Sequence, residues 1–167
     1  MQYFYTIQDL HIKFTNQNQR ALMSKVSDIL HRKSNKVISV SPNTCVIDAL
    51  KIMNEKNIGS ILVMEDETYL GIMTERDYAR KVILKGKHST ETSVSEIMST
   101  DLPHVNPRDT MEYCMQLMAD SNVRYLPVFE NGALKGIISI LDVIQATVDV
   151  QKATITNLQD FISSNYG

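Results

Sequence analysis

Two short segments carry a hydroxyl side chain followed three positions later by a carboxylate. The first segment, residues 71–77, reads Gly-Ile-Met-Thr-Glu-Arg-Asp, and the second, residues 136–142, reads Gly-Ile-Ile-Ser-Ile-Leu-Asp. In each segment an apolar run ends at the hydroxyl, and an amphipathic run follows, so a strand is predicted to pass into a helix there. A hydroxyl at the N-cap and an Asp three residues later form a reciprocal cap, which stabilises a helix by about 1 kcal/mol.

The same pair of side chains has a second use, in binding. A carboxylate at a helix N-terminus can accept hydrogen bonds from both hydroxyls of a ribose. The free N–H groups and the helix dipole at that end favour a phosphate nearby. Capping is the commoner role for an isolated segment of this kind.

The two segments are the same part of a longer internal repeat. An offset of 65 residues (107 − 42) aligns identical residues over most of both copies. The aligned pairs include Pro42 with Pro107, Asn57 with Asn122, Gly71 with Gly136 and Asp77 with Asp142. Upstream, residues 26–30 match residues 94–98 at an offset of 68, which requires three extra residues in a loop of the first copy.

Each copy is predicted to have the order β-α-β-β-α. The expected strands are residues 37–40, 60–64 and 69–73 in copy one, and 103–105, 125–129 and 134–138 in copy two. The closing helices are expected at residues 76–84 and 141–148, and Asp109 to Glu112 reads as a capping box that begins another helix. Asn131-Gly132 favours a tight hairpin turn of type I′.

These elements predict an α/β fold of the α+β type, with two copies packed through their sheets about a pseudo-twofold axis, because one copy alone buries little surface. The expected organisation is an N-terminal extension (1–22), copy one (23–86), a polar linker (87–93), copy two (94–149) and a helical tail (150–167). Apolar residues at helical spacing in the tail suit packing on the copies or on another subunit.

The doubled unit resembles a pair of cystathionine-β-synthase-type (CBS) repeats, or Bateman module. The matching blocks are V-S-P, I-G-S-I-L-V and G-I-M-T-E-R-D in copy one, and V-N-P, V-R-Y-L-P-V and G-I-I-S-I-L-D in copy two. The resemblance implies a regulatory module rather than an enzyme, which binds AMP, ADP, ATP, NAD(H) or S-adenosylmethionine between the copies. It also implies a homodimer that signals occupancy to an unknown regulated protein.

The resemblance further implies which residues bind the ligand. Asp77 and Asp142 would accept the ribose hydroxyls beside Thr74 and Ser139, and Ile72 and Ile137 would line the adenine slots. The Asp142 site would also use Ser41, Ile58 and Gly59, and the Asp77 site would use Asn106, Val123 and Arg124. Arg124 is the expected phosphate contact. Two roles are possible for Arg76, a phosphate contact or a surface salt bridge. Lys81 is expected on a solvated helix face.

Composition excludes several other classes of protein. The 167 residues carry a formal net charge of −2, so a general nucleic-acid-binding protein is not expected. Apolar runs are too short to span a membrane and no secretory signal is visible, so a cytoplasmic location is expected. The four histidines and two cysteines lack metal-ligand spacing, and no Gly-x-Gly-x-x-Gly motif is present. The remaining alternatives are a nucleotide sensor and a protein-interaction module with the same fold.

Overall fold

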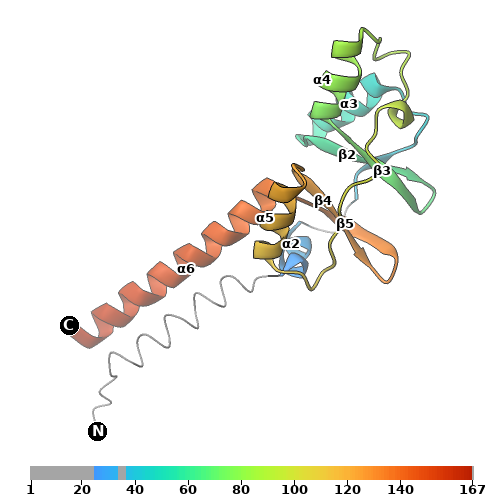
Figure 1. Cartoon of the computed structure of the whole chain (residues 1–167). Helices are drawn as coiled ribbons and strands as arrows, with labels where there is room; N and C mark the ends of the chain where they lie inside the picture. The colour runs from blue at the N-terminus through green and yellow to red at the C-terminus, as the bar shows by residue number, and fades with distance from the viewer. Residues whose placement is uncertain (1–24, 34–36, 167) are drawn as a thin grey trace.

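The computed structural model describes residues 25–33 and 37–166, and the expected extension 1–22 lies outside them. The first half contains α2 (Val26–Arg32), β1 (Ser39–Val40), α3 (Val46–Lys56), β2 (Ser60–Glu65), β3 (Thr68–Thr74) and α4 (Glu75–Lys81). The second half contains α5 (Met111–Asp120), β4 (Tyr125–Glu130), β5 (Ala133–Ser139) and α6 (Ile140–Tyr166). Short 3-10 turns lie between the halves at Ile83–Lys85 and Val94–Glu96. Figure 1 shows two small sheets, each with its own helices, which confirms the mixed α+β fold.

Each half is built on an antiparallel hairpin. β2 pairs with β3 and β4 pairs with β5, and both ladders shift register at the same repeat position, after Val63 and after Val128. The turn at Asn131-Gly132 has positive φ at both residues, 51° and 78°, as a type I′ turn requires. In the first half β1 runs parallel to β2. The matching strand expected at residues 103–105 is reduced to one bridge, between Val105 and Val128.

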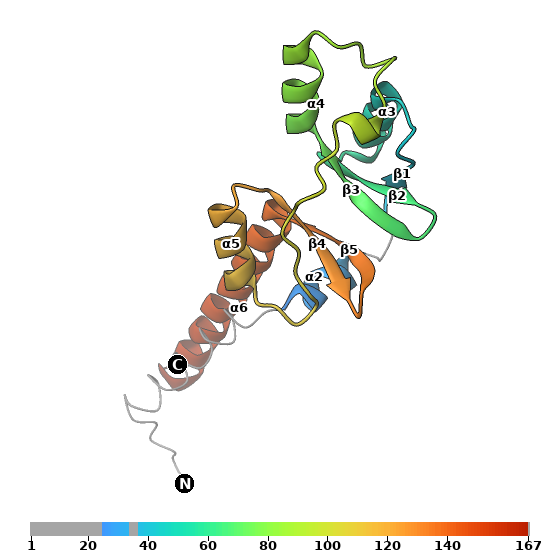
Figure 2. The same ribbon diagram turned by 45° about the vertical axis from the view of Figure 1, so that its right-hand side comes forward.

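The two halves exchange their leading segments. Val26 and Ile29 of α2 are buried in the core of copy two, with Cys114, Leu126 and other residues of that copy. Conversely, Val94 and Ile97 are buried in the core of copy one. Figures 1 and 2 both show α2 beside the β4–β5 hairpin. Each core is therefore completed by a segment that precedes the other copy in the sequence.

A glycine marks the point where each exchanged segment crosses a sheet. A Cβ on Gly71 of β3 would lie 2.7 Å from the Ser99 carbonyl oxygen, and a Cβ on Gly136 of β5 would lie 2.9 Å from Leu30 Cδ2. The contact at Gly71 is with a backbone atom, so the absence of a Cβ allows the crossing there, whereas at Gly136 the neighbour is the end of a leucine side chain, which can move. Next to Gly71, the Ile72 and Ser99 main chains exchange hydrogen bonds of 3.0 and 2.8 Å.

The linker between the copies packs against copy one through hydrogen bonds. The N–H groups of Val46 and Ile47, which have no partner within α3, donate to the carbonyls of Thr92 and Ser89 at 2.9 and 3.0 Å. The Thr92 hydroxyl donates to the His88 carbonyl oxygen at 2.8 Å. The linker thus caps α3, whose N-cap residue Cys45 makes no side-chain cap bond.

Two helix boundaries differ from the expectation. The N-cap of α5 is Thr110, whose hydroxyl accepts the Tyr113 N–H, whereas Asp109 instead accepts two hydrogen bonds from Asn106. The helix expected at 141–148 and the tail expected from 150 form one helix, α6, of 27 residues. No Gly or Pro interrupts the sequence there, so nothing ends the helix at residue 149.

Cys114 lies fully buried among the apolar side chains of copy two, as core packing predicts. Burial raises the pKa of its thiol to about 11. Cys45 is half-buried, and neither thiol is in a disulfide. Within residues 25–33 and 37–166, no helix is both long and apolar enough to cross a membrane.

Candidate functional site

A cavity of about 490 Å³ opens beside the start of α4. Its walls come from four places: Gly59 before β2, the end of β3 with α4, residues 98–102 between the copies, and residues 122–125 between α5 and the start of β4. Residues of both copies therefore form it. The lining residues are Gly59, Ile72, Thr74, Glu75, Arg76, Asp77, Lys81, Met98, Ser99, Thr100, Asp101, Leu102, Asn122, Val123, Arg124 and Tyr125.

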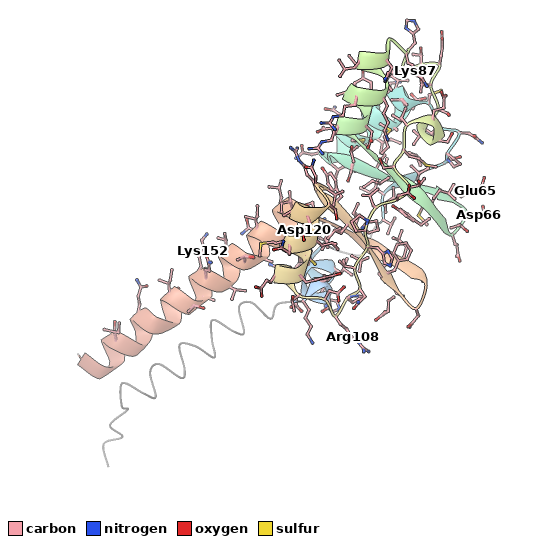
Figure 3. All side chains as sticks on the ribbon, viewed as in Figure 1. Glu65, Asp66, Lys87, Arg108, Asp120 and Lys152 are labelled. Atoms are coloured by element: carbon pink, nitrogen blue, oxygen red, sulfur yellow. The ribbon has the colours of Figure 1, made fainter. Side chains whose placement is uncertain are left out.

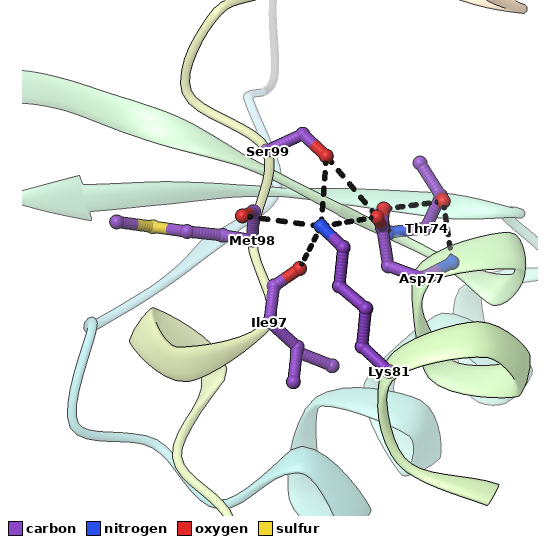
Figure 4. A network of polar contacts seen from close by, with 6 residues as sticks. All are labelled: Thr74, Asp77, Lys81, Ile97, Met98 and Ser99. Atoms are coloured by element: carbon purple, nitrogen blue, oxygen red, sulfur yellow. Dashed lines mark hydrogen bonds and ion pairs between the residues drawn. The ribbon is translucent and has the colours of Figure 1, made fainter. Parts of the chain in front are cut away.

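Asp77 lines this cavity. Both of its carboxylate oxygens accept hydrogen bonds (Figure 4). Oδ2 accepts from the Thr74 N–H at 3.0 Å and from the Thr74 hydroxyl at 2.6 Å, while the Thr74 hydroxyl oxygen accepts the Asp77 N–H at 3.1 Å. This is the reciprocal cap predicted from the motif. Oδ1 accepts from the Ser99 hydroxyl at 3.1 Å and lies 2.8 Å from Lys81 Nζ. Asp77 is only 8% exposed.

The expectation that Lys81 lies on a solvated helix face is wrong. Its ammonium group pairs with Asp77 one turn back on α4 and donates to the carbonyl oxygen of Ile97 at 2.7 Å, and to Ser99 Oγ at 3.2 Å. The i, i+4 spacing of an Asp and a Lys was a signal for this contact. The carbonyl belongs to the exchanged segment, whose position the sequence did not reveal.

The cavity lining carries further charged side chains. Arg76 and Arg124 both line it, and Arg76 Nη1 donates to the Asn122 carbonyl oxygen at 3.2 Å, which joins α4 to copy two. Glu75 and Asp101 are the acidic residues near them. The helix end itself offers little to an anion, because α4 has seven residues and its Asp77 N–H is bonded to Thr74. The arginines are therefore the groups available to bind a phosphate.

Asp142 is held in the same way in copy two. Its Oδ2 accepts from the Ser139 N–H at 2.6 Å and from the Ser139 hydroxyl at 2.7 Å, and it lies 2.7 Å from Lys33 Nζ. Burial acts to raise the pKa of Asp142, but the hydrogen bonds from Lys33 and Ser139 outweigh burial, so the pKa lies below its ordinary value. Ile137, expected to line this site, offers its carbonyl to Lys33 at 3.5 Å.

The other expected binding residues are distributed as follows. Gly59, expected beside Asp142, lines the Asp77 cavity, where a Cβ would meet the Tyr125 hydroxyl at 2.5 Å. Asn106, expected beside Asp77, lines a different cavity and donates a hydrogen bond to Asp109. The Ser41 hydroxyl accepts the Asn43 N–H at 3.4 Å, and Ile58 packs against the core of copy one. Ile72, Thr74, Val123 and Arg124 line the Asp77 cavity, as expected, and Arg76, whose role was left open, lines it too.

Sequence reasoning missed Ser99, Asp101, Glu75 and Tyr125 at the cavity. Ser99 and Asp101 follow the exchanged segment, for which the motifs held no signal. Tyr125 begins β4 next to Arg124, and burial raises the pKa of its phenol. In the part of the chain that the structure describes, no three His, Cys, Asp or Glu side chains converge on a possible metal position.

The family follows from comparison with known proteins. The model of the CBS domain matches twice, at residues 26–83 and 94–149. The chain belongs to the CBS-domain family. Because the two matches cover most of the sequence, the chain is a tandem CBS pair, and CBS pairs of this kind are regulatory, signal-transduction proteins.

Curated relatives and solved structures agree with this assignment. The CBS domain-containing protein YhcV of Bacillus subtilis is 35% identical over 138 residues, which cover 81% of this chain and 96% of that protein. CBSX3, a mitochondrial CBS domain-containing protein of Arabidopsis thaliana, is 33% identical over 150 residues, or 84% of this chain and 73% of that protein. A CBS-domain structure from Burkholderia ambifaria, assigned to signal transduction, is 40% identical with a TM-score of 0.73, covering 75% of this chain and 95% of that one. A hexameric CBS-CP12 protein from bloom-forming cyanobacteria is 31% identical with a TM-score of 0.65. The match covers 74% of this chain and 67% of that one.

Proposed function

We propose that the cavity beside α4 binds an adenine nucleotide, AMP, ADP, ATP or NAD(H), and that the protein is a regulatory sensor rather than an enzyme. The observation that carries the proposal is the position of Asp77. A nearly buried carboxylate, fixed by Thr74, faces a cavity of about 490 Å³ that both copies line. That volume lies within the range of small-molecule sites.

The lining suits each part of such a ligand. Asp77 offers carboxylate oxygens to the vicinal hydroxyls of a ribose, which donate hydrogen bonds. Ile72, Met98 and Val123 supply apolar surface for a base. Arg76 and Arg124 supply guanidinium groups for one or more phosphates. Because the walls belong to both copies, a ligand with different affinities for two arrangements of the copies would shift the balance between them.

A direct test is calorimetric titration of the purified chain with AMP, ADP, ATP, NAD(H) and GMP. Adenine ligands should bind, and Asp77→Asn should weaken them by about tenfold or more, since a hydrogen bond to a charged group contributes about 1.5–3 kcal/mol. Thr110→Val is the matched control, because it removes the α5 cap outside the cavity. Absence of binding by the wild-type chain, or equal losses in both variants, would reject the proposal.

One observation favours a second role, self-association or protein interaction. Among the α6 side chains that the structure describes, four large apolar ones are exposed: Leu141, Ile144, Ile155 and Ile162. Three of them, at 141, 155 and 162, are separated by multiples of seven residues and so lie on one face of the helix. In Figures 1 and 2 the C-terminal part of α6 projects away from both sheets. We propose that this face pairs with a second copy of the chain.

A further inference from the structure

The Asp77 carboxylate has no free acceptor position in this structure. It receives two hydrogen bonds at Oδ2 from Thr74, and one from Ser99 and one from Lys81 at Oδ1. An ionised carboxylate has about four lone-pair sites, and four donors fill them. A ribose can therefore bind Asp77 only if a present donor leaves.

Lys81 is a donor that can leave Asp77 and still keep other partners. The two hydrogen bonds from Thr74 belong to the N-terminal cap of α4. Their loss would leave the Thr74 N–H and hydroxyl without this acceptor. Lys81, in contrast, keeps a partner without Asp77, because its ammonium group already donates to the Ile97 carbonyl oxygen at 2.7 Å. Its side chain is 40% exposed, so water can also solvate it.

Lys81 also joins the cavity to the exchanged segment. Its three contacts beyond Asp77 are the carbonyl oxygens of Ile97 and Met98, at 2.7 and 3.4 Å, and Ser99 Oγ, at 3.2 Å. Figure 4 shows the ammonium group between this segment and Asp77. Ile97 is fully buried in the core of copy one, and the chain beyond Ser99 leads to copy two. A change at Lys81 therefore acts on the connection between the two copies.

We propose that Lys81 is a specificity and sensing residue of this cavity: it competes with the ligand's 2′- and 3′-hydroxyls for Asp77 and, when displaced, releases its tie between Asp77 and residues 97–99. This inference rests on the proposed nucleotide function. The proposal has a measurable consequence. Displacing Lys81 from Asp77 costs free energy, and this cost offsets part of the binding free energy that the ribose hydroxyls contribute. The wild-type site should discriminate weakly between a ribonucleotide and its 2′-deoxy form.

The test compares AMP with 2′-deoxy-AMP by calorimetric titration of wild-type protein, Lys81→Met and Arg80→Met. The phosphate and base are common to both ligands, so their contacts cancel in the ratio of the two dissociation constants. In Lys81→Met the hydroxyls meet a free Asp77 oxygen, and the preference for AMP should rise by about tenfold. Arg80→Met is the matched control, because Arg80 is exposed on the same helix and does not line the cavity.

Each result supports or rejects the proposed role of Lys81. A preference for AMP that is equal in wild type and Lys81→Met overturns the role of Lys81 and leaves the nucleotide function standing. No binding of AMP by the wild type overturns both. If Lys81→Met does not fold, Lys81→Gln replaces it, since a neutral amide retains a donor for Ile97 but loses the ion pair.

Discussion

Lys33 Nζ lies 2.7 Å from Asp142 Oδ2, although 109 positions of sequence separate the two residues. In copy one the equivalent carboxylate, Asp77, pairs with Lys81 of its own helix. The copies thus keep the same ion pair but take the lysine from different elements. The position of Lys81 in copy two is Ala146 (81 + 65), and Asp101, just after the other exchanged segment, stands 68 residues after Lys33 (33 + 68).

Lys33→Met should raise the pKa of Asp142. The hydrogen bond from Lys33 is the largest factor that lowers this pKa, and without it burial acts in the opposite direction. A carboxyl whose folded pKa is depressed stabilises the protein above its unfolded pKa of about 3.9, and this contribution is lost as the pH falls through the folded value. Wild type should therefore exceed Lys33→Met in stability at pH 7, and the difference should shrink below about pH 4.

The measurement is carboxyl NMR titration of Asp142 together with denaturant unfolding at pH 7 and at lower pH. Lys33 is 42% exposed, so solvent screens the pair and the stability loss should stay below about 1 kcal/mol. Lys56→Met is the control, because Lys56 pairs with the exposed Glu55. An Asp142 pKa that does not move in Lys33→Met would show that the contact is absent in solution.

Gly71→Ala should destabilise the protein through the crossing of the exchanged segment. The new Cβ would lie 2.7 Å from the Ser99 carbonyl oxygen, which accepts from the Ile72 N–H, while the Ser99 N–H donates to the Ile72 carbonyl oxygen. Overpacking that shifts backbone typically costs about 1–3 kcal/mol. Denaturant unfolding should show a loss in this range, with faster exchange of the Ile72 and Ser99 amides. A variant as stable as wild type would mean that the segment does not cross β3 so closely.

Local patterns in the sequence were sufficient to predict much of this fold. The repeat offset predicted both hairpins, and the Thr74–Asp77 and Ser139–Asp142 pairs predicted the caps that fix the two carboxylates. Asn131-Gly132 predicted its turn because positive φ at two consecutive residues favours those residue types. All of these features depend on residues close together in the chain, for which spacing is informative.

The exchange of the leading segments could not be predicted in the same way. Residues 26–30 and 94–98 have the same apolar pattern, which fits either core equally well, so the pattern does not say which core each one joins. The places of Lys81, Ser99 and Asp101 at the cavity depend on that choice. Gly71 and Gly136 were visible as a repeated pair in the sequence. The close contacts that each makes are with residues distant in the sequence, so the sequence did not show why glycine stands there.

Ile155→Lys should weaken self-association of the chain. Ile155 is 55% exposed on α6, and a lysine would place a charge at the centre of the proposed helix pairing. Light scattering after size-exclusion chromatography should show the mass falling toward the 19.0 kDa of one chain. Thr156→Lys adds the same charge at the next, also exposed, position and should leave the mass unchanged. Equal masses for wild type and Ile155→Lys would assign another surface to any assembly.

Arg124→Ala should weaken phosphorylated ligands without an equal effect on adenosine. Arg124 lines the Asp77 cavity near Arg76, and charge-assisted hydrogen bonds from a guanidinium to phosphate are about twice as strong as neutral ones. Its counterpart in copy one is Gly59 (124 − 65), so only this arginine supplies the charge at that repeat position. The affinity for AMP should fall by about tenfold, while that for adenosine should change little.

Calorimetric titration of both ligands separates a phosphate contact from a general disturbance of the cavity. Arg108→Ala removes the same charge from a residue at the surface, labelled in Figure 3, that does not line the cavity. It should leave both affinities unchanged, because a solvated charge at a distance is screened by salt. Equal losses of AMP and adenosine in Arg124→Ala would mean that the side chain shapes the cavity, and would leave Arg76 as the phosphate contact.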